Sequence, residues 1–197
     1  MPTQTFLKLN KEKKIRILKA AKKEFSRVSI DKAIIAHIAK DAGIPRGSFY
    51  QYFSSVEDLY MYLIDYLYNS KKKKFEGFLQ ECNNDIDEAF KLKLAMEIET
   101  RVSEENSMFK VNAFILLFNK NEYSQEMTSY ILNRQVQLDK TFFPEEIIKT
   151  KNFEKFLNLV IGLNDLCLKR YLTKEMSAEE IIKYYNEYID FMKENIF

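Results

Sequence analysis

Residues that break helices are scarce in this chain, with four glycines and three prolines spread over 197 positions. Leucine, isoleucine, lysine, glutamate and phenylalanine dominate instead, and this balance favours long helices over a sheet-rich fold. In several segments, apolar residues recur every three or four positions, which is the period of an amphipathic helix. The sequence therefore predicts an all-α fold of about nine helices joined by short connections.

Three of these seven helix breakers lie within one short segment, AGIPRGSFYQYF. An apolar stripe stops just before Gly43, and glycine can adopt the left-handed conformation that ends a helix. Ile44 can then fold back as the hydrophobic contact of that cap, and Pro45 suits the first turn of a new helix. The pattern predicts a helix-turn-helix unit. Its expected helices span about 11–28, 35–42 and 45–52.

Two capping motifs mark helix starts after this segment. Ser54 and Glu57 predict a capping box, in which each side chain accepts a backbone N–H of the other residue. The helix that begins there extends to about Leu79, and Ser177 with Glu180 predicts a second box before the last helix. The expected helices of the remaining chain lie near 86–103, 107–119, 122–141, 152–172 and 178–196.

The helix pattern and the charge divide the chain at the same place. Residues 1–53, with the helix-turn-helix motif at 34–53, carry 12 Lys and Arg against 4 Asp and Glu, a net charge of +8. Residues 54–197 form a helical body that carries 19 against 25, a net charge of −6. A basic head suggests a polyanionic partner, although lysines also form ordinary solvated helix surface, so charge alone leaves both interpretations open.

The sequence lacks the motifs of an enzyme or a metal protein. It has one histidine, His37, no Cys/His cluster and no phosphate-binding glycine loop, so we predict no catalytic residue, metal or cofactor. Cys82 and Cys167 belong to no CxxC motif and are interpreted as buried thiols in a reducing cytoplasm. The longest apolar run, at 113–118, is far shorter than the ~20 residues of a membrane span. The first residues also lack the apolar core of a signal peptide.

The predicted helix at 45–52 has two chemically different sides. On a helical wheel, Phe49 lies on the side that packs, and Phe53 is expected to join it in the core. Arginine can bond a guanine edge with two N–H groups, glycine lets the backbone approach, and hydroxyl groups bond phosphate oxygens. Tyr52 lies nearer the packing side and is left open between core and contact. The candidate DNA-contacting residues are Arg46, Gly47, Ser48, Tyr50, Gln51 and Tyr52.

The run IAKDAGIPRGSFYQYFSSVEDLY resembles the N-terminal domain of the tetracycline-repressor (TetR/AcrR) family of transcriptional regulators. The resemblance covers about residues 12–62 and implies that Arg46, Gly47 and Ser48 contact bases. It also implies that the aromatic and amide residues after them contact phosphates or flanking bases. The matching positions are Ile38, Ala39, Ala42, Gly43, Ile44, Gly47, Tyr50, Tyr52, Phe53, Glu57 and Leu59.

Two positions depart from the family pattern. Many members carry Ser or Thr at the start of the second helix, where this chain has Ala33-Ile34. Many also carry Lys at the position of Val56. A hydroxyl and a cation that could bond phosphate are thus missing. We expect the basic first helix, through Lys13, Lys14 and Lys22, to replace this phosphate attraction.

The body is expected to provide a dimer interface and an effector site. The helix at 152–172 has two apolar stripes, one of them through Leu159, Leu163 and Leu166, and so must be covered on two sides. The resemblance implies a homodimer through the last two helices, which binds a pseudo-palindromic DNA operator as a repressor and is released by a small lipophilic effector. The candidate effector-binding residues are Asn112, Asn164, Met96, Phe114, Phe118, Met127 and Tyr130.

Asn164 interrupts the main apolar stripe of its helix. Because a buried amide must be hydrogen-bonded, we expect it to bond either another helix or a ligand. Two other functions stay open for the whole chain. One is a protein-interaction module whose DNA-binding head is vestigial, suggested by Ala33-Ile34 and Val56, and the other is an all-helical enzyme.

Overall fold

The computed structural model describes residues 2–100 and 140–196. Every regular element in these ranges is helical, which confirms the all-α class. The helix predicted at 107–119, and nearly all of the one predicted at 122–141, lie outside the described residues. The described elements are α1 (Gln4–Leu7), α2 (Lys11–Arg27), η1 (Ile30–Lys32), α3 (Ile35–Ala42), α4 (Arg46–Tyr52), α5 (Val56–Glu81), α6 (Ile86–Thr100), η2 (Lys140–Phe142), α9 (Glu145–Ile148), α10 (Phe153–Leu172) and α11 (Ala178–Ile196).

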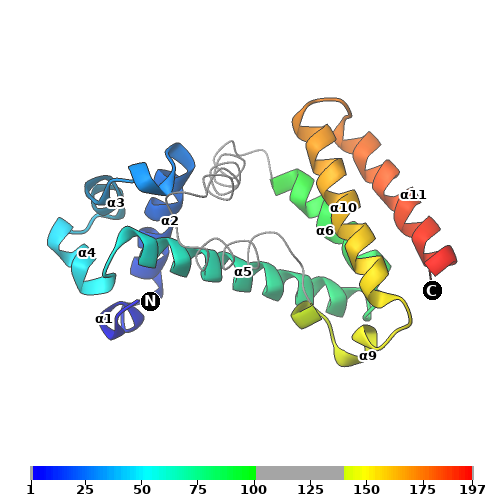
Figure 1. The fold of residues 1–197 in the computed structure, drawn as a ribbon, viewed down its shortest axis with the longest axis horizontal. Helices are drawn as coiled ribbons and strands as arrows, with labels where there is room; N and C mark the ends of the chain where they lie inside the picture. Colours follow the sequence, from blue (N-terminus) through cyan, green and yellow to red (C-terminus); the bar gives the residue numbers. More distant parts are fainter. Residues whose placement is uncertain (1, 101–139, 197) are drawn as a thin grey trace. The chain divides into compact units, whose positions relative to one another are not determined.

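The described residues fall into two compact units, residues 2–69 and residues 70–100 with 140–196. The boundary lies inside α5, whose first turns bury Leu59 and Leu63 in the same core as α2, α3 and α4. The proposed domain border at residue 53 stays a prediction. These first turns of α5 therefore pack against the helix-turn-helix and share its core (Figure 1).

The turn between α3 and α4 has the predicted geometry. Gly43 is left-handed, with φ 63° and ψ 42°, and the N–H of Ile44 donates to the carbonyl of Ala39 over 3.0 Å. This bond ends α3 in the way that a Schellman cap does, and Ile44 folds back until only 8% of it is exposed. Pro45 is the N-cap of α4 and does not lie inside its first turn.

The cap of α5 lies one residue later than predicted. The Ser55 hydroxyl accepts the N–H of Asp58 at 3.2 Å, and Ser54 instead donates its hydroxyl to the Asp58 carboxylate. The cause is Phe53, which is held in the core with an extended backbone (φ −138°, ψ 141°), so that the helix begins only at Val56. The predicted box at Ser177 and Glu180 is confirmed, with reciprocal bonds of 3.2 and 2.8 Å.

The second unit packs α6, α10 and α11 against one another (Figure 1). Buried aromatic rings fill it, among them Phe75, Phe90 and Phe143, with ring centroids 5.0 to 6.1 Å apart. Ion pairs join α6 to α11 at its surface, such as Lys91 to Asp190 at 2.6 Å. No helix among the described residues is long and apolar enough to cross a membrane.

The two cysteines differ in burial, and we expect them to differ in reactivity. Cys167 is fully buried, and burial raises the pKa of its thiol to about 11, whereas Cys82 is only partly buried. Because the thiolate is the reactive form, a thiol reagent at about pH 8 should modify Cys82 first and Cys167 only after unfolding. Labelling Cys82→Ser with and without denaturant measures this. Full reaction of that variant in its native state would contradict the burial of Cys167.

Candidate nucleic-acid interface

The helix α4 turns one polar side toward solvent. Phe49 and Phe53 are 1% and 0% exposed, as the sequence predicted, and they fix the helix on the core. On the other side Tyr50 is 54% exposed, and Arg46 and Gln51 are exposed as well. A Cβ added to Gly47 would meet no atom of the described residues within 4 Å, so the backbone is open to a partner at this point. The half-buried residue of the predicted set is Ser48.

Tyr52 lies on the packing side of α4. It is 4% exposed, and its ring meets that of Phe6 edge to face at 6.1 Å. The ammonium group of Lys13 lies 5.6 Å from the centre of the same ring. This burial does not fit the assignment of Tyr52 to DNA contact, and we leave it out of the interface proposed below.

Lys13 and Lys14 make contacts inside the unit. The Lys14 ammonium donates to the carbonyl of Leu7 at 2.6 Å, and so bonds the end of α1. Lys13 donates its backbone N–H to the Asn10 side chain at 2.8 Å and holds its ammonium near the Tyr52 ring. Both side chains thus have a role in holding the N-terminal segment. Their role as phosphate contacts stays a prediction.

The short helix α1 holds the carboxyl end of α4. Thr3 donates its N–H to the carbonyl of Tyr52 at 2.9 Å and its hydroxyl to the carbonyl of Gln51 at 2.6 Å. Phe6 is fully buried, and its ring packs against that of Phe53 in a tilted arrangement with the ring centres 4.7 Å apart. Carbonyls at a helix end need such donors. The helix α1 is not among the helices predicted from the sequence, although threonine is a favoured N-cap residue and the Thr3 hydroxyl accepts the N–H of Phe6.

Replacing Thr3 with valine should lower the free energy of unfolding of the first unit by ~1 kcal/mol. Valine keeps the shape of the side chain but loses both the N-cap of α1 and the bond to the Gln51 carbonyl. Thr5→Val is the matched control, because Thr5 is an exposed residue of the same helix. Urea unfolding followed by circular dichroism measures the difference. An equal loss of unfolding free energy in the two variants would contradict the role of Thr3 in holding α1 on the end of α4.

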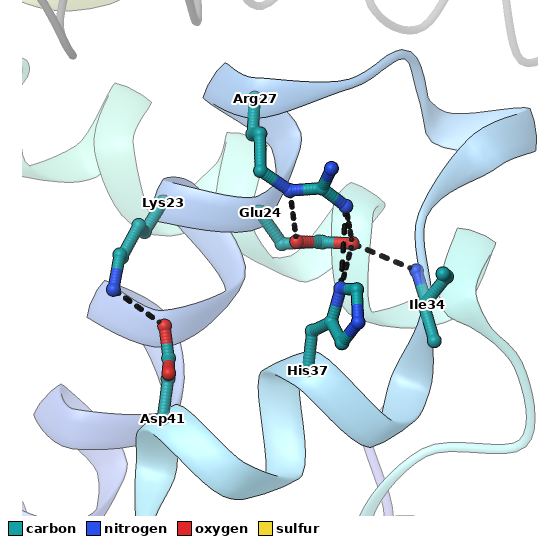
Figure 2. A network of polar contacts seen from close by, with 6 residues as sticks. All are labelled: Lys23, Glu24, Arg27, Ile34, His37 and Asp41. Carbon is teal, nitrogen blue, oxygen red and sulfur yellow. Dashed lines mark hydrogen bonds and ion pairs between the residues drawn. The ribbon is translucent and has the colours of Figure 1, made fainter.

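A buried carboxylate links α2 to the start of α3 (Figure 2). Glu24, 5% exposed, accepts the N–H of Ile34 at 3.0 Å and two bonds from the Arg27 guanidinium at 2.7 and 3.0 Å. His37 is half exposed, and its Nδ1 lies 3.2 Å from Oε1 of the same carboxylate. Burial opposes the ionisation of Glu24, but the bonds from Arg27 and Ile34 outweigh it and lower its pKa.

The effector candidates are only partly within the described residues. Asn112, Phe114, Phe118, Met127 and Tyr130 lie outside them, and Met96 is 40% exposed on α6. Asn164 accepts a bond from the Lys93 ammonium at 3.0 Å, and Lys93 also pairs with Glu97 at 3.2 Å. Asn164 thus bonds another helix, which is one of the two alternatives expected for it; the other was a ligand.

Both α10 and α11 leave apolar residues uncovered. On α10, Leu159 and Leu166 are 52% and 38% exposed, and a Cβ added to Gly162, between them, would meet no atom within 4 Å in the part of the chain that the structure describes. On α11, Tyr188 and Phe191 are 46% and 62% exposed. Of the second predicted stripe of α10, the two outer leucines, Leu159 and Leu166, are therefore exposed. Its third member, Leu163, is 9% exposed and belongs to the core.

The N-terminal sequence matches a known family. Residues 17–63 match the sequence model of the family described as bacterial regulatory proteins, tetR family. A protein of Bacillus subtilis strain 168, named as the uncharacterized HTH-type transcriptional regulator YdgC, is 33% identical over 106 residues. These residues are 53% of this chain and 54% of that protein, so the chain matches about half the length of this relative.

Solved structures share the fold over nearly the whole chain. FadR, the fatty acid degradation regulator of Bacillus halodurans, has a TM-score of 0.59 at 18% identity, over 92% of this chain and 96% of that one. A TetR family regulator of Chloroflexus aurantiacus has 0.50 at 22%, over 98% and 94%. FadR of Bacillus subtilis, in complex with stearoyl-CoA, has 0.51 at 14%, over 89% and 97%.

At these identities the structural likeness concerns the fold, and the match to the tetR family rests on the sequence of the helix-turn-helix. The matched residues 17–63 include most of α2, all of α3 and α4, and the first turns of α5. They contain the left-handed turn at Gly43 and the exposed side of the short helix that follows it. At its N-terminus the chain thus carries a domain that matches the tetR family of bacterial regulatory proteins.

Proposed function

We propose that this protein is a cytoplasmic transcriptional regulator, and not an enzyme, which binds duplex DNA with α4 in the major groove. The observation that carries the proposal is the exposed side of α4. It combines the guanidinium of Arg46, the open backbone at Gly47, the amide of Gln51 and the phenol of Tyr50 on a helix anchored by buried rings. A cation and an amide are the groups that read guanine and adenine edges, and a phenol hydroxyl can bond phosphate.

The charge of the chain supports the same partner. Residues 1–53 carry a net charge of +8, and exposed cations such as Lys11, Arg16 and Lys40 are distributed over α2 and α3. Neutralising phosphates releases counterions from DNA, so affinity falls steeply as salt is added. A positive head on a negative body also directs the DNA to the head.

The second unit supports a two-fold dimer. Leu159, Leu166 and Phe191 are large apolar side chains that are exposed among the described residues, and the bare backbone at Gly162 allows a second helix to approach closely. A contact between copies through α10 and α11 would cover both helices. Because a two-fold dimer presents two reading helices, the operator should be a pseudo-palindrome whose half-sites lie about one helical turn, or a multiple, apart.

We further propose that a lipophilic effector binds within the helical body and releases the protein from its operator, so that the protein acts as a repressor. Such an effector must prefer the state that does not bind DNA, with a coupling of ~1–3 kcal/mol. The FadR protein of Bacillus subtilis, whose fold is similar, was solved with stearoyl-CoA. Long-chain acyl-CoA is therefore the first effector to test on the preformed DNA complex, with free coenzyme A as the control.

The experiment that tests the regulator proposal measures DNA affinity as salt is raised. Fluorescence anisotropy compares a duplex selected by the protein from a random pool with an unrelated duplex of equal length. The regulator should prefer the selected duplex, and both affinities should fall steeply between about 50 and 200 mM salt. A vestigial head, which is the second candidate because Val56 replaces a lysine of the family pattern, would give no preference.

A further inference from the structure

The amino end of α3 has no side-chain cap of its own. Ile34 occupies the N-cap position, and its side chain has no oxygen to accept a backbone N–H. The first N–H groups of a helix have no partner within the helix, and a cap residue normally accepts one of them. Because α3 carries the turn that leads to α4, a frayed start of α3 would disturb the support of the reading helix.

Glu24 supplies an acceptor from a neighbouring helix. Its Oε1 accepts the N–H of Ile34 at 3.0 Å, although ten residues separate the two in sequence (Figure 2). In a capping box, the residue at position N3 accepts the N–H of the N-cap residue. Here N3 is His37, a histidine, and its Nδ1 contacts the carboxylate of Glu24. Glu24 thus makes the bond that a glutamate at N3 would make.

The carboxylate is held in place by its other partners. Arg27, one turn further along α2, bonds both of its oxygens in a fork, at 2.7 and 3.0 Å. A buried carboxylate is stable only when such bonds satisfy it, and a paired arginine fixes its orientation. A negative charge near the first turn of a helix is also favourable, because the exposed N–H groups there carry partial positive charge.

We propose that Glu24 is a positioning residue for DNA binding, which caps α3 from α2 in place of a local cap at Ile34. The proposal deepens the proposed function and rests on it, because the capped helix supports the turn into α4. Ala33 and Ile34 carry no hydroxyl, and the Glu24 carboxylate bonds the backbone amide of Ile34 instead.

The first test is hydrogen exchange of backbone amides in the full-length protein without DNA. Glu24→Leu removes the acceptor, and the amides at 34–37 should exchange about tenfold faster relative to those of α4. Asp41→Asn is the matched control. It breaks an exposed ion pair that also joins α2 to α3, Lys23 to Asp41 at 2.7 Å, but lies at the other end of α3 and should leave these amides unchanged.

Glu24→Gln makes the same test if the leucine variant does not fold. Glutamine keeps an oxygen that can accept the Ile34 N–H but loses the charge, so acceleration should be smaller and confined to the same amides. For either variant, equal acceleration throughout α2, α3 and α4 would overturn the proposal. That result would mean that Glu24 contributes general stability and has no particular role at the start of α3.

A rescue experiment provides the second test. Glu24→Leu should weaken binding to the selected duplex about tenfold, and Ile34→Ser should recover part of this loss, because a serine at the N-cap accepts the N–H of Ala36 or His37 and holds the same first turn. In the wild-type background the same serine should change affinity much less. An equal factor in both backgrounds would overturn the proposal, because the two residues would then act independently. If wild-type protein binds no DNA, the proposed function fails, while the exchange test of the cap still stands.

Discussion

Replacing Arg46 with alanine should weaken binding to the selected duplex by ~1–3 kcal/mol and relax the base preference at one position of each half-site. Arg46 is the first residue of α4 and is exposed, beside the open backbone at Gly47. Its fork of N–H groups matches the two acceptors on the edge of guanine. Anisotropy titrations on the selected duplex, on single-base variants of it and on unrelated DNA measure the effect.

Arg46→Lys is the control that separates base reading from charge. Lysine keeps the positive charge but lacks the planar fork, so affinity for unrelated DNA should be retained while the preference for the selected duplex falls. If Arg46→Ala weakens both duplexes by the same factor, Arg46 contacts only phosphate. The reading function would then have to be assigned to Gln51 or another residue of α4.

Replacing Leu159 with glutamate should convert the proposed dimer to monomer at micromolar concentration. Leu159 is 52% exposed on α10, next to the open backbone at Gly162. In a two-fold contact the new carboxylate appears twice and loses water without gaining a partner, which costs at least ~2 kcal/mol at each position. Phe191→Glu on α11 should have the same effect. Sedimentation equilibrium measures the dissociation constant of the dimer.

Leu172→Glu is the matched control for the dimer prediction. Leu172 has the same type of side chain on the same helix and a similar exposure of 49%, but its position points it away from the stripe of Leu159 and Leu166. It should leave the dimer intact. A wild-type protein that is monomeric at micromolar concentration would contradict the proposed interface, as would a Leu159→Glu variant that dimerises as well as wild type.

The helices whose apolar stripe extends over several turns could be predicted from the sequence. The boundaries of α2, α10 and α11 agree with the expected ranges within one residue, because a stripe over several turns specifies both the helix and its buried side. The turn at Gly43 could also be predicted, since few residues other than glycine adopt its backbone conformation readily. The helix α1 was missed, because four residues form barely one turn and establish no period.

The features that could not be predicted depend on contacts between distant residues. Either Ser54 or Ser55 can cap a helix, and only the burial of Phe53 decides between them. The role of Glu24 depends on the approach of α2 to the start of α3. In the sequence of α2 alone, Glu24 cannot be told from the other charged residues of that helix. The burial of Tyr52 could not be predicted, because it involves a ring contact with Phe6 of the unpredicted α1.

The central claim is that a dimer of this chain reads DNA with α4. Selection from a pool of random duplexes, followed by hydroxyl-radical footprinting on the enriched sequence, tests it most directly. We predict an enriched inverted repeat and two protected patches related by two-fold symmetry, with centres ~34 Å or a multiple of this apart. We also predict that Arg46→Ala loses the enrichment. A pool that stays random after several rounds, or a single protected patch without symmetry, would contradict the account.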